Sequence, residues 1–321
     1  MSNDHDLVLV VDALNLFTRH YVAHPAVNGN GLHVGGVVGF LYAIVNLVEQ
    51  YRPIKVIVIW ESGGSPRRRA IYKEYKSKRR PEKLNRYYED DLPDTVENRN
   101  YQISLIVELL KNTPIRQVYV ADCEADDVIA YLSRYTFRKN RKMIVSSDRD
   151  YYQLLDEKTI IYSPTWKKFV TSKDVVSKFG ILPDNFCLAK CVCGDISDNI
   201  DGVKGVGFKT LSKRFPELLM NENVKISDLI EESKKRIDQG SKLKIYTALM
   251  SSEDIIRRNW KLIYLDMGML SASQIKKIND IVDTFKPERN KIQTIRILMR
   301  ESIQTFNVDR MFLSLSCVEA K

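Results

Sequence analysis

The sequence lacks the features of membrane-spanning and secreted proteins. None of its apolar runs is long enough to cross a bilayer, and the segment 1–6 is acidic and polar, so we expect no secretory signal. The five cysteines are odd in number and lack the spacing of a disulfide framework, which favours a reducing cytoplasm. With 321 residues, 44% hydrophobic and 28% charged, the chain can form one large soluble domain or two modest ones.

Soft metal ligands and nucleotide-binding loops are also scarce. Cys187, Cys191 and Cys193 lie close together, but no histidine follows at zinc-site spacing. We interpret them as buried thiols on a helix, with metal binding as the less favoured alternative. His20 and His24 stand four apart, but no residue nearby completes a metal set. No Walker A loop or dinucleotide fingerprint is present, because the glycines of 202–207 do not follow a strand.

Acidic residues stand at the ends of four predicted strands. Apolar runs ending near residues 11, 60, 121 and 147 alternate with helical patterns, which predicts an α/β fold with a parallel sheet and helices on both faces. Since the carboxyl ends of parallel strands meet at one edge of a sheet, the acids that follow should share one crevice. These acids are Asp12, Glu61, Glu124, Asp126, Asp127, Asp148 and Asp150.

The chemistry of this acid set favours a hard cation. Acids at 124–127 also suit a helix N-terminus, and that simpler interpretation applies to any one of them. Several carboxylates crowded at one edge repel each other, and a hard cation relieves that repulsion. Oxygen ligands without histidine or cysteine favour Mg²⁺ over zinc.

The net charge of +9 is concentrated in one segment. Residues 67–86 contain ten Lys or Arg and two Glu, a surplus of +8. A run of this kind is often only a solvated face, but a concentrated surplus favours a polyanionic partner. Tyr72, Tyr75, Tyr87 and Tyr88 are interleaved with these cations and could stack on bases, so nucleic acid is the predicted partner.

The chain becomes mostly helical after residue 170. We therefore expect an α/β core at 1–170, with the basic region at 67–98, and a helical region at 171–321. Within the latter, the glycines of 194–215 would let backbone N–H groups approach a phosphate closely. A plain turn between two helices is the alternative.

Together these motifs resemble the flap endonuclease/5′-exonuclease family, which includes bacteriophage 5′ nucleases, one of them called RNase H, and the 5′-nuclease domain of bacterial DNA polymerase I. The resemblance covers about residues 6–215 and rests on Asp12, on Glu124–Asp127, on Ser147–Asp150 and on Gly194–Thr210. It implies a PIN/Rossmann-like sheet, a helical arch at 67–98 that includes Tyr75–Arg79, and a helix–two-turn–helix motif at 194–215.

The family's functional residues can be carried over to the matched positions. Asp12, Glu124 and Asp126 would hold one divalent ion, and Asp148, Asp150 and Asp198 the second. Asp127 and Asp195 would lie nearby, and Glu61 stands where the family usually has the shorter Asp, which leaves direct coordination there open. Lys76 and Arg79 would contact the scissile phosphate. The nucleic-acid-binding set would be Tyr75, Lys76, Arg79, Arg80, Gly202, Lys204, Gly205, Gly207, Lys209 and Thr210.

The resemblance and the residues agree on a phosphodiester hydrolase. We expect a 5′ nuclease with two Mg²⁺ per site, replaceable by Mn²⁺, and with K⁺ at the glycine turn. Its substrates would be DNA or RNA/DNA with 5′ ends or flaps, including RNA primers. By analogy, a monomer would work with a single-strand-binding protein or a sliding clamp. A PIN-type ribonuclease would lack the basic arch and the glycine turn, and a non-catalytic duplex-binding module would not need converging acids.

Overall fold

A parallel sheet forms the centre of the molecule. The structure is a computed structural model that describes residues 6–61, 63–78 and 96–319. Among these residues the sheet has the order β3-β2-β1-β4-β5-β6, in which only β6 runs antiparallel to its neighbour. Its strands are β1 Leu7–Asp12, β2 Lys55–Trp60, β3 Arg116–Tyr119, β4 Arg141–Val145, β5 Thr159–Ser163 and β6 Lys168–Val170. The predicted α/β class is confirmed, and β5 and β6 extend the sheet beyond the four predicted strands.

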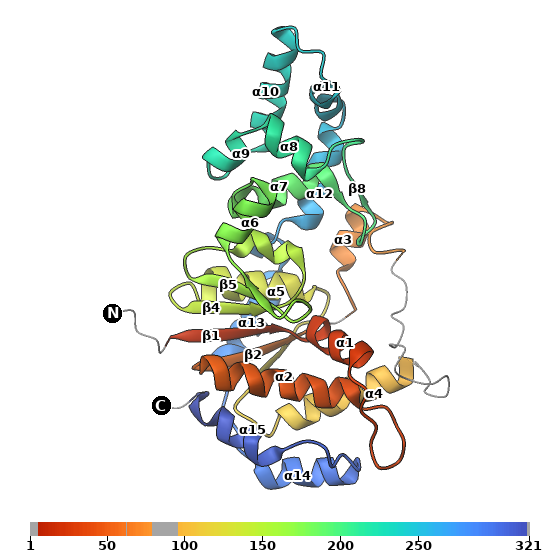
Figure 1. Cartoon of the computed structure of the whole chain (residues 1–321), viewed down its shortest axis with the longest axis vertical. Helices are drawn as coiled ribbons and strands as arrows, with labels where there is room; N and C mark the ends of the chain where they lie inside the picture. Colours follow the sequence, from red (N-terminus) through yellow and green to blue (C-terminus); the bar gives the residue numbers. More distant parts are fainter. Residues whose placement is uncertain (1–5, 62, 79–95, 320–321) are drawn as a thin grey trace.

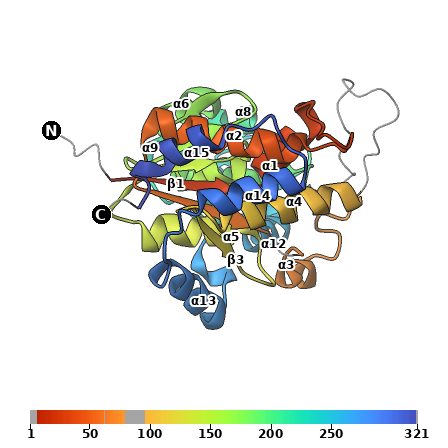
Figure 2. The ribbon, with the colours of Figure 1, turned by 90° about the horizontal axis from the view of Figure 1, so that it is seen from below.

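Both faces of the sheet are covered, which explains why its central strands are continuously apolar. In β1, Leu7, Leu9 and Val11 pack into one core while Val8 and Val10 pack into the other, as the two-residue period of a strand requires. The first face is covered by α1 Ala13–Ala23, α2 Gly35–Tyr51 and α4 Val96–Leu110. The second is covered by α5 Ala125–Tyr131, the π-helix η1 Leu132–Thr136 and α13 Ala272–Asp283, which lies beside the edge strand β3 (Figure 2).

A helical layer with its own core lies beyond the β4–β6 side of the sheet (Figure 1). Its elements are α3 Pro66–Ile71, α6 Ser172–Phe179, α7 Pro183–Cys193, α8 Phe208–Arg214, α9 Glu217–Met220, α10 Ile226–Asp238, α11 Lys244–Ser251 and α12 Glu253–Ile263. The short 3-10 helix η2 Arg149–Leu154 joins this layer to β4, and the hairpin β7 Gly194–Asp195 and β8 Ile200–Asp201 follows α7. The three cysteines predicted to be buried on a helix all lie on α7, where Cys187 and Cys191 are buried and Cys193 is half-buried.

The last part of the chain returns to the α/β core. After η3 Met267–Met269 come α13, α14 Lys291–Arg300, α15 Val308–Ser314 and η4 Leu315–Cys317. Ile278 and Val282 of α13 enter the second core, while Ile297 and Leu315 enter the first. The helical region expected from residue 171 onward therefore contains two parts that pack against different cores, and α14 lies at the opposite end of the molecule from α10 (Figure 1).

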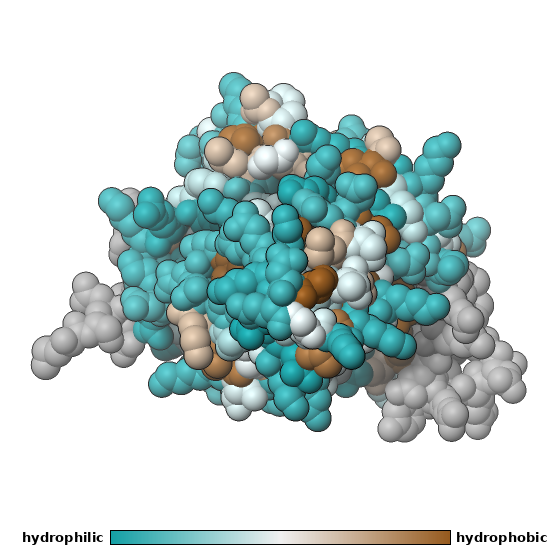
Figure 3. Space-filling model, turned by 90° about the horizontal axis from the view of Figure 1, so that it is seen from above, coloured by the Kyte–Doolittle hydropathy of each residue, from teal (hydrophilic) through white to brown (hydrophobic). Residues whose placement is uncertain are grey.

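Two surface properties bear on function. Across the described helices, none is both long and apolar enough to span a membrane. The end of the molecule formed by α10 and α11 exposes mainly hydrophilic residues, with hydrophobic ones only in small separate patches (Figure 3).

Candidate metal centre

The sheet brings acids from distant parts of the sequence to one edge. Asp12 is the last residue of β1, and its Oδ1 accepts a hydrogen bond from the backbone N–H of Asn15 at 3.2 Å, which caps α1. Asp148 follows β4 and caps η2 through the N–H of Asp150 at 2.8 Å. Glu124 is the N-cap of α5, shortly after β3. Each acid lies at a strand-to-helix junction, and the side chains of Asp12 and Asp148 also satisfy helix N–H groups there.

Five of the acids form two groups that share one member. Asp126, Asp148 and Asp150 each offer a carboxylate oxygen within 4.8 Å of the others, and so do Asp150, Asp195 and Asp198. The loop of β7–β8 therefore supplies two ligands to a site whose other members come from the α/β core. Both groups consist only of carboxylate oxygens, the donor set that Mg²⁺ and similar hard cations prefer.

Asp12 joins the first group through a buried tyrosine that the sequence interpretation missed. The hydroxyl of Tyr151 lies 3.1 Å from Oδ2 of Asp12 and 2.5 Å from Oδ1 of Asp126. Burial and the charge of Asp126 raise the pKa of Asp12 to about 7. Burial and the neighbouring acids also raise the pKa of Tyr151, which therefore keeps its proton and bridges the two carboxylates.

The pKa values of the two remaining acids of the first group, Asp148 and Asp150, are also raised. Burial raises the pKa of Asp148 well above its ordinary value, and Asp150 and Asp126 add to the shift. Burial also raises the pKa of Asp150, although the positive charge of Lys190 opposes it. Negative charge is therefore concentrated here beyond what the protein neutralises, as a cation-binding site requires.

Lys190 on α7 is a second residue that the sequence interpretation missed. Its Nζ forms an ion pair with Asp150 and lies 2.6 Å from Oδ2 of Asp195. Burial alone would lower the pKa of Lys190, but these acids raise it, so the side chain stays charged. A lysine inside the otherwise apolar run 186–192 was a signal that could have revealed it.

Lys76, which was predicted to contact the scissile phosphate, lies at the acid cluster. Its Nζ is 2.8 Å from Oε2 of Glu124 and 3.9 Å from Oδ2 of Asp198, and its backbone N–H donates to the carbonyl of Asp198 at 2.9 Å. Burial would raise the pKa of Glu124, but the charges of Lys76 and Arg68 lower it. Arg79 and Arg80, the other cations of the predicted arch set, lie outside the described residues.

Three predicted site residues have different surroundings from those expected. Both oxygens of Asp127 accept hydrogen bonds from Arg68, at 2.6 and 2.7 Å, in a fully buried pair, so Asp127 anchors α3 to α5 and does not face the acid groups. Glu61 follows β2 but lies outside both groups. Tyr75 is 6% exposed and donates its hydroxyl to Glu124 at 2.9 Å, so its ring is not available for stacking on bases.

The glycine turn lies next to the acids. A Cβ on Gly202 would lie 2.3 Å from the carbonyl carbon of Cys193, so only glycine allows the β7–β8 hairpin to close. Gly205 has a φ of +78°, in the left-handed region. The exposed residues of the turn are Lys204, Gly205, Gly207, Lys209 and Thr210. A cleft of about 690 Å³ joins Asp148 and Asp195 to Gly207.

Several known proteins are similar to this chain in sequence or fold. A family model described as 5′-3′ exonuclease, N-terminal resolvase-like domain, matches residues 7–180. The 5′-3′ exonuclease of Aquifex aeolicus is 30% identical over 258 residues, which cover 77% of this chain and 85% of that protein. DNA polymerase I of Bacillus subtilis is 30% identical over 252 residues, 76% of this chain but 26% of the polymerase. The T5 5′-exonuclease with bound zinc ions has a TM-score of 0.69 at 22% identity, covering 86% of this chain and 98% of the other.

Proposed function

Because the chain belongs to the 5′-3′ exonuclease family, we propose that it is a Mg²⁺-dependent, structure-specific nuclease that cuts near 5′ ends and flap bases. Its products would carry 5′-phosphate and 3′-hydroxyl groups. One observation carries the proposal: two groups of three carboxylates share Asp150 at the carboxyl edge of the sheet. A nuclease that uses two cations needs such a pair of adjoining oxygen sites.

The acid groups suggest how the two cations would be divided. Asp126, Asp148 and Asp150, with Asp12 beside them, would hold one, and Asp150, Asp195 and Asp198 the other. When bound, these ions would supply a water nucleophile at neutral pH and stabilise the attacking and leaving oxygens. This division differs from the one that the family resemblance implied, in which Glu124 would join Asp12 and Asp126, because Glu124 lies in neither acid group of this structure.

The chain's own residues would position and neutralise a phosphodiester. Lys76 would move from Glu124 toward the scissile phosphate and add a donor where negative charge develops; loss of one such donor costs about 100- to 1000-fold in rate. Tyr151 would hold Asp12 and Asp126 in place, while Lys190 would limit repulsion between Asp150 and Asp195. Arg79 would be a second contact to the phosphate.

The exposed glycine turn is the proposed contact for the duplex. Backbone N–H groups near Gly205 and Gly207, with Lys204, Lys209 and Thr210, would bind phosphates on one strand, with a K⁺ ion held at the turn. The cleft from Asp195 to Gly207 supports a strand running from this turn to the acids. Asp201 adds negative charge beside the turn and should weaken duplex affinity. Binding should also fall with salt, because each phosphate that a lysine of the turn neutralises releases counterions.

The proposed biological role is the removal of RNA primers or 5′ flaps by a monomer in the cytoplasm, together with a single-strand-binding protein or a sliding clamp. The family match disfavours a PIN-type ribonuclease, and the shared acid groups disfavour a module that only binds duplex.

Cleavage of an end-labelled 5′-flap duplex tests the proposal. In Mg²⁺ the protein should release the flap strand, whereas Ca²⁺ should support binding without cleavage. Asp126→Asn should reduce the rate by at least about 100-fold, because it removes a charged oxygen from the first acid group. Asp122→Asn is the matched control, since Asp122 is exposed and belongs to neither group.

Two results would contradict the proposed function: a wild-type cleavage rate for Asp126→Asn, or cleavage that continues after chelation of divalent ions. A parallel time course on an RNA-primed duplex and on single-stranded RNA would distinguish primer removal from PIN-type activity.

A further inference from the structure

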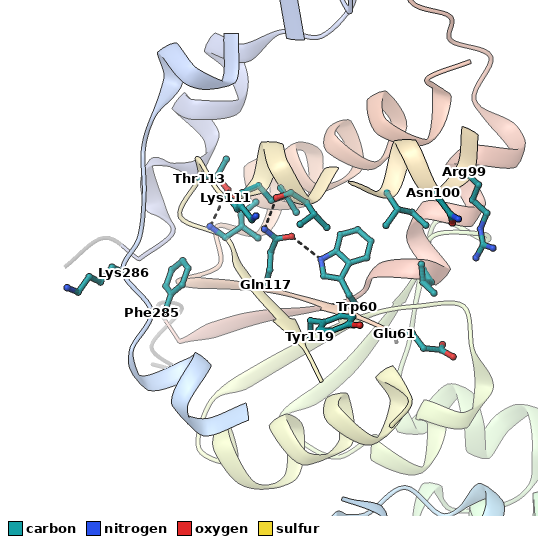
Figure 4. Close-up of a pocket in the computed structure, with 15 residues that line it drawn as sticks. Trp60, Glu61, Arg99, Asn100, Lys111, Thr113, Gln117, Tyr119, Phe285 and Lys286 are labelled. Atoms are coloured by element: carbon teal, nitrogen blue, oxygen red, sulfur yellow. Dashed lines mark hydrogen bonds between the residues drawn. The ribbon is translucent and has the colours of Figure 1, made fainter. Parts of the chain in front are cut away.

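A large cavity separate from the acid groups lies under α4, against the edge strand β3. Its volume is about 720 Å³, within the range of ordinary ligand pockets. Trp60 and Tyr119 form one wall, and Phe285 lies at the far end (Figure 4). Ile103 and Val107 of α4 also line the cavity. The cavity is therefore an apolar slot that aromatic rings border on two sides.

The slot begins beside the proposed metal centre. Glu61 borders the slot and also borders a second space of about 400 Å³, which Tyr75, Lys76 and Glu124 line. Glu61 lies at one end of the slot in Figure 4, and Phe285 and Lys286 lie at the other. A strand that passes Lys76 and Glu124 can therefore continue past Glu61 into the slot.

The charges around the slot suit a polyanion. Arg99, Lys111 and Lys286 line it, and Glu61 is the one acid among the lining residues that the structure describes. The Nε of Arg99 is buried and has no hydrogen-bond partner within the described residues. Cations beside aromatic rings are the composition of single-strand binding grooves, in which bases stack and phosphates meet positive charge.

The Trp60 wall is held in place before any ligand arrives. The indole N–H of Trp60 donates to Oε1 of Gln117 at 3.0 Å, and Gln117 donates to the carbonyl of Val107 at 3.0 Å, which links the strands to α4. Trp60 also stacks on Phe40, with ring centroids 6.0 Å apart. A wall fixed in this way reduces the entropy cost of ordering a flexible strand. Tyr119 is 53% exposed, and the Nζ of Lys277 lies 5.6 Å from the centroid of its ring.

We propose that this slot binds bases of the single-stranded 5′ extension after the strand has passed the metal centre. Tyr119 stacks on a base, and Arg99, Lys111 and Lys286 neutralise its phosphates. This inference rests on the proposed function, because it assigns the substrate's 5′ tail to a subsite of the same enzyme.

The test measures affinity in Ca²⁺, in which the substrate should not be cut. Three ligands are compared: a duplex with a 5′ tail, the same duplex with abasic residues throughout the tail, and a duplex without a tail. Tyr119→Ala should weaken binding of the tailed duplex by at least about 5-fold, the lower limit for loss of one stacked base. It should leave the other two affinities unchanged, and Tyr119→Phe should bind like the wild type.

The matched control is Tyr135→Ala, because Tyr135 is an exposed tyrosine on η1 that does not line the slot. It should bind all three ligands like the wild type. Equal affinity of Tyr119→Ala and wild type for the tailed duplex would overturn the proposal, as would an equal loss on the abasic tail. If the slot instead binds a peptide that pairs with the edge of β3, Tyr119→Ala and the wild type would bind the tailed duplex equally. Failure of the proposed function would instead appear as absence of flap cleavage by the wild type in Mg²⁺.

Discussion

Replacing Lys190 with methionine should destabilise the protein when divalent cations are absent and make its stability depend more strongly on them. Methionine keeps much of the length of the side chain but removes the charge that lies between Asp150 and Asp195. These acids would then face each other in a buried site without a positive partner. Lys190→Met therefore distinguishes the stabilisation that the acids gain from the lysine from the stabilisation that they gain from a bound metal ion.

The expected loss follows from the burial of the ion pair. Removing one partner of a buried pair costs about 3–5 kcal/mol, because the other is left uncompensated. Asp150 already has a raised pKa, and without Lys190 that pKa rises further, so protonation of Asp150 should limit the loss to about 3 kcal/mol near neutral pH. A carboxyl whose pKa is raised in the folded state stabilises less as pH increases, so the deficit should grow with pH.

Urea denaturation followed by circular dichroism, first in EDTA and then with increasing Mg²⁺, measures this effect. An ion that binds only the folded state adds about 2.7 kcal/mol at 100 times its dissociation constant. Without the charge of Lys190 the acids should bind Mg²⁺ more tightly than in the wild type, so this gain should be larger in Lys190→Met and the deficit should shrink as Mg²⁺ increases. Lys142→Met is the matched control: Lys142 is also buried, but its Nζ bonds to the backbone carbonyl of Phe137. Equal stability of Lys190→Met and wild type in EDTA, or a deficit that Mg²⁺ does not change, would refute the reasoning.

Three further predictions concern the structure around the site. Either Arg68→Met or Asp127→Asn should cost about 3–5 kcal/mol in urea denaturation, because each leaves one buried charge unpaired; a loss below about 1 kcal/mol would contradict this. Burial lowers the pKa of His20 from 6.5 to about 4, so the unfolded state gains protons first on acidification. The wild type should lose about 2 kcal/mol between pH 7 and 5 that His20→Gln does not lose; parallel pH profiles of the two proteins would refute it. Gly202→Ala should lower stability by about 1–3 kcal/mol in thermal denaturation because its Cβ meets backbone, whereas Gly207→Ala has open space and should be tolerated.

Much of the acid cluster could be predicted because it depends on a simple rule of parallel sheets. Asp12, Asp126, Asp148 and Asp150 follow apolar strand segments, and strands that run in the same direction end at the same edge. Asp195 and Asp198 do not follow strands of the sheet, and they could be anticipated only through the family resemblance. Their arrival at the same site as Asp150 is a finding of the structure.

Residues that act through long-range contacts were not predictable in this way. Arg68 lies in a basic run that suggested only a solvated or nucleic-acid-binding face, yet it is 1% exposed and paired with Asp127. No local pattern marks Tyr151 as a site residue, but its hydroxyl bridges two acids. In each case the functional partner is far away in the sequence, and no local pattern specifies which side chain it meets.

The sequence by itself determined the fold class, the oxygen-only chemistry of the acid set and the position of the glycine turn, because these depend on local periodicity and residue type. Only the tertiary structure decided which acids meet, since their grouping depends on the order β2-β1-β4 and on the path of α7 into the β7–β8 loop. The packing of α7 on η2 brings Lys190 between Asp150 and Asp195. Contacts of this kind form only when segments distant in sequence pack together, so no single stretch of the chain predicts which residues will meet.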